Sequence, residues 1–369
     1  METTSQAQER AEDVLRLLQA ARGAEILGPA GLSAELAGQR YPVMRPASGE
    51  GLAEALAVLG EHALSVLVRG GGTKLPPGLA SAGARVVLET GALGGVHELD
   101  VEEGVVRVGA GLALCDLAAA LEGTGWELPL DPPGPGGSVG GALAAAAVGP
   151  RFARPRDVVL GLDVVLASGE RTRCGGRVVK NVTGYDLAKL HVGGFGALGV
   201  IESAWLRLRP SPEQVEVRVL PLPSGEAGFE LALEASRRPT VRVAAQLDAG
   251  TACALGVPGT EAGPVAEAPG CLVVELAGDT PAVEADRAWL AGSAELQAAD
   301  PDWTRRLRLA QGGALAGERA EPEAGLRLRV ALAASRLGQA AQALARMGGR
   351  TLAYPERGLL YAWLALPAS

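Results

Sequence analysis

The sequence predicts an α+β protein of two domains. A chain of 369 residues with 48% hydrophobic content can bury a large core, and it exceeds the usual size of one compact domain. Short strand patterns dominate the first half, while strand and helix patterns alternate in the second half. The two prolines of Arg209-Pro210-Ser211-Pro212 interrupt both helix and strand, so this segment is the clearest linker. We therefore expect one domain over residues 1–210 and a smaller one over 211–369.

Two kinds of pattern define the elements expected before the linker. Apolar residues at helical spacing predict helices at Gln8–Ala21, Leu52–Leu59, Leu114–Leu121 and Gly184–Val192. Apolar or alternating runs bounded by turn residues predict strands at Leu64–Val68, Arg85–Leu88, Gly95–Leu99, Val105–Val108, Val158–Leu166, Arg171–Cys174 and Val200–Leu208. The proline-rich stretch Trp126–Pro135 is expected to be an extended loop.

The same patterns continue after the linker. Strands are expected at Val215–Leu220, Val241–Ala245, Cys271–Leu276, Leu326–Val330 and Leu359–Trp363. Helices are expected at Ala227–Ser236, Ala282–Leu296 and Ala334–Met347. The stretch Gly250–Pro269 is rich in Ala, Gly and Pro and is expected to be a surface loop or a turn-laden connection.

Composition excludes several classes of function. A net charge of −8 and a pI near 5.2 argue against general nucleic-acid or membrane-surface binding, which needs clustered positive charge. The polar N-terminus shows no secretory signal, and the apolar runs Ala142–Val148 and Leu328–Ala334 are too short or too interrupted to span a bilayer. The cysteines form no CxxC pair, which favours idle thiols in a reducing cytosol over disulfides or an iron–sulfur site. We expect a cytoplasmic protein whose iron–sulfur chemistry, if any, belongs to a partner.

One short run stands apart from this composition. The only asparagine of the chain, Asn181, lies in the run Lys180–Asp186, and two of the three lysines, Lys180 and Lys189, lie in or beside it. The third, Lys74, follows a triple glycine. A chain that otherwise avoids these residue types has kept them here, which suggests a local role that other residues cannot fill.

Two familiar motifs match by sequence but not by context, and a third fails outright. Gly194–Gly199 matches GxGxxG, yet a helix is expected before it and a strand after it, the reverse of the nicotinamide-binding fingerprint. Gly136–Gly140 matches GxSxG, but the proline-rich stretch before it cannot be the strand that a nucleophile elbow requires. Gly70–Lys74 is too short for a P-loop. A nicotinamide-dependent enzyme, a serine hydrolase and a P-loop protein are therefore disfavoured.

What remains is a set of three glycine-rich loops at 70–73, 134–141 and 193–199. Glycine allows backbone amides to approach an anionic ligand, and consecutive amides form a nest for phosphate oxygens. Thr73 and Ser138 add hydroxyl donors, and arginines are locally frequent between Arg151 and Arg177. The alternative is that the glycines only mark tight turns in a chain with 52 of them. Taken together, the loops favour a cradle for the pyrophosphate of a dinucleotide.

The order and spacing of these segments resemble the FAD-binding domain of the vanillyl-alcohol-oxidase/p-cresol-methylhydroxylase type. The resemblance covers roughly residues 40–210 and is closest to the smaller flavin subunit of three-subunit glycolate oxidases. It rests mainly on Leu128–Pro150 and Gly175–Glu202. It implies a two-subdomain FAD-binding domain followed by a smaller α+β cap domain over 211–369, for which no motif is recognisable.

The resemblance also implies roles for individual residues. Gly70, Gly71, Gly72 and Thr73, flanked by Arg69 and Lys74, would wrap the FAD pyrophosphate. Pro133, Ser138, Val139, Gly140 and Gly141 would form a second loop at the pyrophosphate and the flavin edge. Ile201 would meet the adenine end, and Gly194 and Gly199 would permit its close passage. Asn181, Tyr185 and Asp186 would order a loop beneath the flavin, although Tyr185 and Asp186 could simply cap the following helix.

The sequence departs from the family pattern at several positions, and these departures bear on how FAD is attached and on what the cap can contribute. Ser138 stands where threonine is usual, which keeps the hydroxyl, and the segment before Arg156 is shorter than usual. The Gly70–Lys74 loop has no histidine, so we expect FAD to be bound non-covalently. Related subunits that oxidise 2-hydroxy acids directly carry a cap-domain histidine cluster for metal and substrate. This chain has no histidine after His191, so its cap can supply no imidazole base or ligand.

Three functions therefore stay open. The first is an FAD-binding subunit of a glycolate oxidase complex, in which a larger flavin subunit oxidises the 2-hydroxy acid and an iron–sulfur subunit carries the electrons away. The second is a self-sufficient FAD-dependent 2-hydroxy-acid dehydrogenase that acts on glycolate or D-lactate. The third is a flavin-free structural subunit. The catalytic residues are not identified, no metal site is expected, and no nucleic-acid partner is expected.

Overall fold

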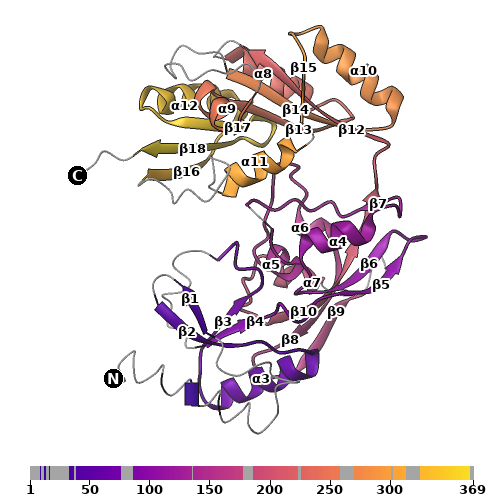
Figure 1. The fold of residues 1–369 in the computed structure, drawn as a ribbon, viewed down its shortest axis with the longest axis vertical. Helices are drawn as coiled ribbons and strands as arrows, with labels where there is room; N and C mark the ends of the chain where they lie inside the picture. The colour runs from indigo at the N-terminus through magenta and orange to yellow at the C-terminus, as the bar shows by residue number, and fades with distance from the viewer. Residues whose placement is uncertain are drawn as a thin grey trace. The chain divides into compact units, whose positions relative to one another are not determined.

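The chain divides into two compact units, which are described separately. The computed structural model describes residues 33–36, 39–75, 86–134, 136–177, 186–222, 226–257, 270–300, 302–312 and 325–365, with a few isolated positions before them. The first unit comprises Met1–Leu130, Gly136–Val148 and Ala153–Ser211, and the second comprises Asp131–Pro135, Gly149–Phe152 and Pro212–Ser369 (Figure 1). Two short segments from the first half of the sequence thus belong to the second unit.

The first unit opens with a small sheet in the order β1-β2-β4-β3. Its strands are β1 (Ser33–Leu36), β2 (Gln39–Met44), β4 (Val86–Glu89) and β3 (Val66–Arg69). β2, β4 and β3 run parallel, and the crossover from β2 to β3 is helix α3 (Gly49–Glu61). The Ser48 hydroxyl accepts a hydrogen bond from the Gly51 amide at 3.1 Å, which starts this helix at Gly49, before the expected Leu52.

A five-stranded antiparallel sheet forms the rest of the first unit, in the order β5-β6-β10-β8-β9. Its strands are β5 (Val96–Asp100), β6 (Val105–Gly109), β10 (Val200–Arg207), β8 (Val159–Val165) and β9 (Arg171–Gly175). The core on one face is covered by α4 (Leu114–Leu121), α5 (Val139–Ala144), α6 (Pro155–Val158) and α7 (Ala188–His191). Leu117, Leu143 and Leu206 are completely buried there, so this face packs like a protein interior.

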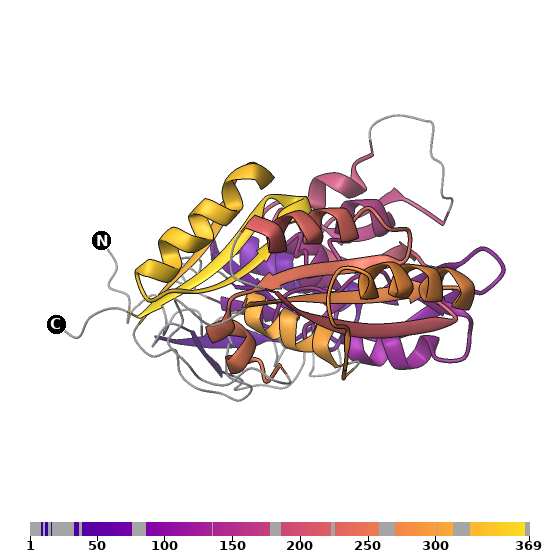
Figure 2. The ribbon, with the colours of Figure 1, turned by 90° about the horizontal axis from the view of Figure 1, so that it is seen from above.

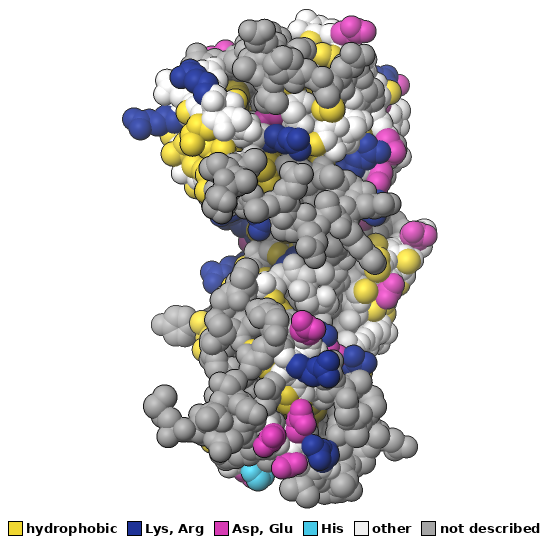
Figure 3. Space-filling model, turned by 60° about the vertical axis from the view of Figure 1, so that its left-hand side comes forward, with side chains coloured by type: hydrophobic (Ala, Val, Ile, Leu, Met, Phe, Trp, Pro, Cys, Tyr) yellow, Lys and Arg dark blue, Asp and Glu magenta, His cyan; other side chains and the backbone are white. Residues whose placement is uncertain are grey.

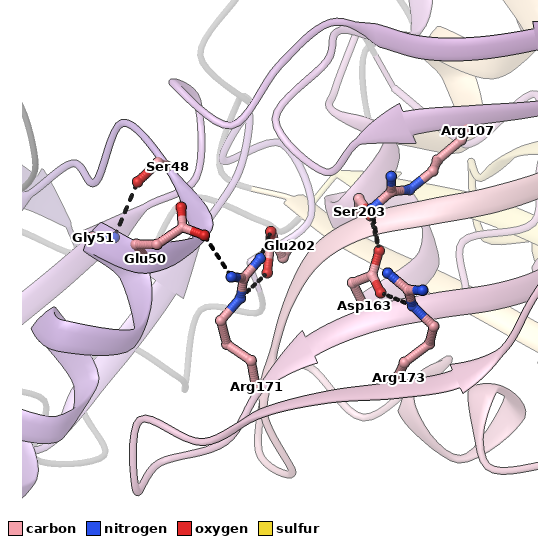
Figure 4. Close-up of polar contacts among 9 residues, drawn as sticks. All are labelled: Ser48, Glu50, Gly51, Arg107, Asp163, Arg171, Arg173, Glu202 and Ser203. Carbon is pink, nitrogen blue, oxygen red and sulfur yellow. Dashed lines mark hydrogen bonds and ion pairs between the residues drawn. The ribbon is translucent and has the colours of Figure 1, made fainter.

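Charged side chains hold the two sheets of the first unit together. Arg171 on β9 donates to Glu202 of β10 at 2.7 Å and to Glu50 of α3 at 2.6 Å (Figure 4). One guanidinium therefore links the helix of the small sheet to two strands of the larger one. Beside it, Asp163 accepts hydrogen bonds from Ser203, Arg107 and Arg173 (Figure 4).

The second unit is a seven-stranded antiparallel sheet in the order β15-β12-β14-β13-β17-β18-β16. The strands are β15 (Gln297–Ala299), β12 (Gln214–Leu222), β14 (Gly270–Gly278), β13 (Val241–Leu247), β17 (Arg350–Tyr354), β18 (Leu359–Ala365) and β16 (Gly325–Ala331). α8 (Glu226–Ala235), α10 (Thr280–Ala291) and α12 (Ala334–Arg346) cover one face, while α9 (Ala249–Ala254) and α11 (Trp303–Gly312) cover the other (Figures 1 and 2). Successive residues of β14 alternate between the two cores, as strand geometry requires.

The predicted α+β class is confirmed, but several predicted elements are wrong. The expected loop over Gly250–Pro269 begins as helix α9, because the Asp248 side chain caps it by accepting from the Thr251 amide at 2.7 Å. Arg209–Pro210 is strand β11, which pairs with β7 (Trp126–Glu127), both in stretches expected to be irregular. Proline is tolerated because these strands form only a two-stranded ribbon.

Other predicted elements are shorter than expected or were missed. α7 spans only Ala188–His191 of the expected helix Gly184–Val192. Strands β1, β2, β15 and β17 and helices α5, α6 and α11 were not predicted. The expected helix Gln8–Ala21 lies outside the described residues, apart from isolated positions.

A buried ion pair anchors one of the short segments in the second unit. Glu275 on β14 is 2% exposed, and its carboxylate accepts two hydrogen bonds from the Arg151 guanidinium, at 2.8 and 3.1 Å. The Thr304 hydroxyl of α11 donates to the same carboxylate. The segment Gly149–Phe152 is thereby fixed to the α11 face of the sheet, where Phe152 also packs edge-on against Tyr354 at 5.0 Å between ring centroids.

The other short segment carries a buried carboxyl group. Asp131 is 3% exposed, and its carboxylate accepts a hydrogen bond from the Arg151 amide at 2.7 Å. Burial raises the pKa of Asp131 to about 6, while Arg151 and Arg308 act in the opposite direction. Asp163 of the first unit behaves differently: burial acts to raise its pKa, but the hydrogen bonds from Ser203, Arg173 and Arg107 outweigh burial and lower it.

Replacing Arg151 by Ala is expected to destabilise the second unit by about 3–5 kcal/mol, because Glu275 would be left buried without its cation. Arg173→Ala is the matched control, since that side chain is 69% exposed and its ion pair should contribute at most about 1 kcal/mol. Thermal unfolding of both variants measures the difference. Adding Glu275→Gln to Arg151→Ala should recover part of the loss, and equal stability of the two single variants would contradict the assignment.

The two carboxyl groups predict opposite dependences on pH. The raised pKa of Asp131 means that its contribution to stability is complete below about pH 4 and is lost as the pH rises through about 6. Asp131→Asn should therefore stabilise the protein above pH 6, by up to about 3 kcal/mol, and the gain should vanish near pH 4. Asp163→Asn should instead destabilise it at neutral pH, with a loss that shrinks as the pH falls below the ordinary aspartate pKa. Melting temperatures measured from about pH 2 to about pH 8 test both dependences.

Candidate functional site

The three glycine-rich loops of the first unit surround one cavity. The first loop follows β3, the second precedes and enters α5, and the third joins α7 to β10. The cavity is lined by Val68, Gly70, Gly71, Gly72, Thr73, Lys74, Leu75, Thr90, Ala110, Gly137, Ser138, Gly140, Gly141, Ala142, Ala144, Ala145, His191, Phe195, Gly196, Gly199, Val200 and Ile201. Segments that are far apart in the sequence therefore meet at this site.

The first and second loops touch through positions that tolerate no side chain. A Cβ atom at Gly70 would fall on the Ser138 hydroxyl, and one at Gly71 would lie 3.0 Å from the Gly137 Cα atom. The Ser138 hydroxyl in turn accepts a hydrogen bond from the Gly141 amide at 3.2 Å, which caps α5. Gly72 has a φ of +71°, a conformation that favours glycine. The backbone thus forms the wall of the cavity here.

Lys74 places a positive charge at the same contact. Its ammonium donates to the Thr73 hydroxyl at 2.9 Å and to the Gly136 carbonyl at 3.4 Å. None of the described residues that line the cavity is acidic. A lysine, two hydroxyl groups and several glycine amides match the chemistry of a phosphate-binding loop.

The third loop is held against the second by backbone hydrogen bonds. The Gly193 amide donates to the Leu143 carbonyl at 3.1 Å, and the Phe195 amide donates to the Ala144 carbonyl at 2.9 Å. Phe195 has a φ of +50°, which is uncommon for a large side chain and costs about 1 kcal/mol or more. A strained aromatic residue at a cavity wall is typical of a ligand site.

The structure gathers most, but not all, of the residues expected to bind the cofactor. Those that line the cavity are Gly70, Gly71, Gly72, Thr73, Lys74, Ser138, Gly140, Gly141, Gly199 and Ile201. Arg69, Val139, Asp186 and Gly194 do not line it, and Pro133 belongs to the second unit. Asn181 and Tyr185 lie outside the described residues. The roles of all these residues stay predictions.

Two of the expected residues that do not line the cavity have other contacts. Arg69 pairs with Glu89, which also pairs with Arg45, so one buried carboxylate serves two guanidinium groups beside the first loop. Asp186 is exposed and forms an ion pair with Lys189 at 3.1 Å. The two residues are three positions apart, a separation at which side chains are neighbours on a helix. The alternative reading of Asp186 as a local helix residue is consistent with this contact.

Sequence reasoning missed several cavity residues. Val68, Ala144 and Ala145 supply apolar surface, and Phe195 and His191 supply rings. His191 is 8% exposed, and burial lowers its pKa, which favours the neutral imidazole. A single histidine at a helix end gives no periodic signal, so only the meeting of distant segments reveals it.

Three further features of the described residues concern membrane-spanning helices, metal ligands and surface charge. None of the described helices is long and apolar enough to cross a membrane. The described residues also contain no group of three or more His, Cys, Asp or Glu that could hold a metal ion. Basic and acidic side chains are interspersed on the face shown in Figure 3, so that face offers no single-sign patch among its described residues.

Known proteins are similar to parts of this chain. A family model described as an FAD binding domain matches residues 42–175, which include the first two loops. D-lactate dehydrogenase of Archaeoglobus fulgidus is 33% identical over 210 residues, covering 56% of this chain and 47% of that protein. Glycolate oxidase subunit GlcE of Escherichia coli is 40% identical over 125 residues, covering 32% of this chain and 35% of that protein. Glycolate oxidase subunit GlcD of Bacillus subtilis is 33% identical over 175 residues, covering 46% of this chain and 37% of that protein.

The aligned regions span less than half the length of each of these relatives.

Solved structures extend the likeness to the second unit. Two structures of alkyldihydroxyacetonephosphate synthase match with TM-scores of 0.66 and 0.68 at 15% and 14% identity, and each match covers 87% of this chain and 68% or 66% of the other. At this identity the match shows a shared fold. Residues 42–175 thus form an FAD-binding domain of the p-cresol-methylhydroxylase type, FAD is the cofactor of this chain, and the domain is one that FAD-dependent oxidoreductases share.

Proposed function

We propose that this chain is the FAD-binding subunit of a glycolate or related 2-hydroxy-acid oxidase complex. In this proposal a larger flavin subunit oxidises the hydroxy acid, and an iron–sulfur subunit carries the electrons away. The observation that carries it is the cavity formed by the Gly70–Lys74 and Gly137–Gly141 loops, which lie within the FAD-binding match of a chain that is also similar to two glycolate oxidase subunits. We also propose a cytoplasmic location for the complex.

The residues of the cavity fit FAD by their chemistry. Gly70–Lys74 and Ser138 would hold the diphosphate through amides, hydroxyl groups and one ammonium. Val68, Ala144 and Phe195 offer apolar surface for a planar ring. When bound, FAD supplies two-electron oxidation of a carbon–hydrogen bond. No cavity-lining histidine or cysteine lies in the first loop, which supports non-covalent binding.

The second unit supports an accessory role. The sequence has no histidine after His191, so that unit offers no imidazole for proton abstraction or metal binding. Two carboxyl groups at the α11 face are buried: Glu275, which is paired with Arg151, and Asp131, which is 3% exposed. A group this buried does not meet a substrate in the described conformation.

One observation favours a second candidate, a self-sufficient 2-hydroxy-acid dehydrogenase. Arg308 of α11 is partly buried, lies close enough to Asp131 to influence its pKa, and forms no ion pair with any described residue. A guanidinium without a partner can clamp a carboxylate, and the D-lactate dehydrogenase relative shares more residues with this chain than the GlcE relative does. The third candidate, a flavin-free subunit, is opposed by the match to the FAD-binding domain.

Expression of the chain alone and with its proposed partners separates the candidates. Alone, it should be yellow, release FAD on acid treatment, and leave glycolate and D-lactate unoxidised with an artificial electron acceptor. Co-expressed with a larger flavin subunit and an iron–sulfur subunit, it should co-purify with them and be required for turnover. Turnover by the isolated chain that is lost in Arg308→Met would establish the second candidate, and a colourless protein would refute both.

The contact between Gly70 and Ser138 gives a second test of the cofactor site. Gly70→Ala should weaken FAD binding by about tenfold or more, because its new Cβ displaces the Ser138 hydroxyl that caps α5. The same change in a Ser138→Ala background should have a much smaller effect, since the displaced atom is already absent. Equilibrium titration of the apoprotein with FAD measures the four dissociation constants.

Gly91→Ala is the matched control for Gly70→Ala. A Cβ at Gly91 meets nothing within 4 Å, and its φ is not positive, so the affinity for FAD should stay within about twofold. Additive effects of Gly70→Ala and Ser138→Ala would show that the two residues do not meet at the site.

A further inference from the structure

A second cavity lies beside the first, at the carboxyl ends of the parallel strands β2, β3 and β4. It is lined by Arg45, Gly70, Glu89, Gly91 and Ala92, and Gly70 is the one described residue that also lines the first cavity. Arg45 follows β2, Gly70 follows β3, and Glu89 ends β4. Because these strands run parallel, their ends meet at one edge of the sheet, which is where open parallel sheets bind ligands.

The charged side chains at this edge carry an excess positive charge. Glu89 is 6% exposed, and Arg69, which stands directly opposite it in the β3–β4 ladder, already pairs with its carboxylate. Arg45 donates to the same carboxylate through Nε at 2.8 Å. Two guanidinium groups and one carboxylate leave a net charge of +1, and neither arginine pairs with another acidic residue in the described ranges. The Arg45 side chain is 42% exposed, so a ligand in the second cavity can reach it.

Backbone donors lie in the wall of the same cavity. The Leu93 amide donates to the Thr90 carbonyl at 2.9 Å, which closes a turn with Gly91 and Ala92 at its centre. The amides of these two central residues donate to no residue that the structure describes. A Cβ atom at Gly91 would meet nothing within 4 Å, so the space beside the turn is open. Unpaired amides next to a guanidinium group match the chemistry that binds phosphate.

We propose that Arg45 and the Gly91–Ala92 turn bind a phosphate group that does not belong to FAD. The group comes from free phosphate or from a small phosphorylated molecule. The assignment to a separate ligand rests on the small overlap of the two cavities, since Arg45, Gly91 and Ala92 line only the second. A guanidinium group matches the geometry of phosphate, and backbone amides add further donors. The inference goes beyond the proposed function, because it does not require the chain to act in an oxidase complex.

Calorimetric titration of the FAD-loaded protein with inorganic phosphate at constant ionic strength tests this proposal. Bound FAD would keep phosphate away from the glycine-rich loops of the first cavity. Arg45→Met should weaken phosphate binding by about tenfold or more, because a charge-assisted contact is lost, while FAD affinity stays within about twofold. Glu89→Gln should instead tighten phosphate binding by about threefold or more, because it raises the net charge of the cluster by one unit.

Arg177→Met is the matched control for Arg45→Met. The Arg177 side chain is 48% exposed, pairs with Glu98 at 3.1 Å and lines neither cavity, so its loss should change phosphate affinity by less than about twofold. Arg45→Met leaves Glu89 paired with Arg69, so the melting temperature of this variant should stay close to that of the wild type. Arg45→Met and Arg177→Met decide the proposal even where Glu89→Gln does not fold.

Methyl phosphate distinguishes the two sources of the group. Methyl phosphate that binds as tightly as inorganic phosphate would indicate a phosphorylated molecule, and selective binding of inorganic phosphate would indicate free phosphate. Wild-type protein that binds neither below about 10 mM, or Arg45→Met that binds phosphate within about twofold of the wild type, would refute the site. Displacement of FAD by phosphate would place the group in the first cavity and equally refute a separate site. A chain that binds no FAD would overturn the proposed function alone, and the same titration of that protein would still test Arg45.

Discussion

The close approach of backbone at Gly70 and Ser138 is the constraint on which the first unit depends. Because no Cβ stands at Gly70, the loop after β3 approaches the start of α5 without displacing the Ser138 hydroxyl, which a Cβ there would overlap. This contact brings amides from two subdomains to one cavity. In the proposed FAD site, the positive end of the interaction with the diphosphate would come from backbone N–H groups, which an acidic chain with three lysines can still supply. The net charge of the chain therefore does not predict which ligands its cavity can bind.

The same region is tied covalently to the second unit on both sides. The segment Gly136–Val148, which carries Ser138 and α5, is preceded by Asp131–Pro135 and followed by Gly149–Phe152. The Arg151–Glu275 ion pair fixes the second of these segments to the sheet of the second unit, and the Asp131 carboxyl of the first accepts a hydrogen bond from the Arg151 amide. Breaking a buried pair costs far more than breaking a surface pair, so the Arg151–Glu275 contact is the strong one of the two.

Local signals explain what could be predicted from the sequence. The glycine loops were found because glycine runs beside strand patterns are visible within a few residues, and α3 was found because its apolar spacing is regular. α11 was missed because Trp303–Gly312 is rich in arginine and buries only Trp303, Leu307 and a few small or polar residues. β17 was missed because Arg350–Tyr354 becomes a strand by pairing with β13 and β18, and the segment itself is short. His191 was missed for the same reason as β17, since only contacts between distant parts of the sequence place it at the cavity.

The lack of histidine in the second half does not by itself decide between an accessory subunit and an enzyme. Proton transfer near neutral pH needs a group with a pKa in that range, and buried carboxyl groups can provide one. Burial raises the pKa of Asp131 to about 6 and that of Glu356 to about 7. What such a group also needs is contact with a substrate, and Asp131 is 3% exposed with one oxygen engaged by the Arg151 amide. Access to this carboxyl, rather than the absence of imidazole, is the physical difference between the two functions, and its burial is why the accessory role is the stronger proposal.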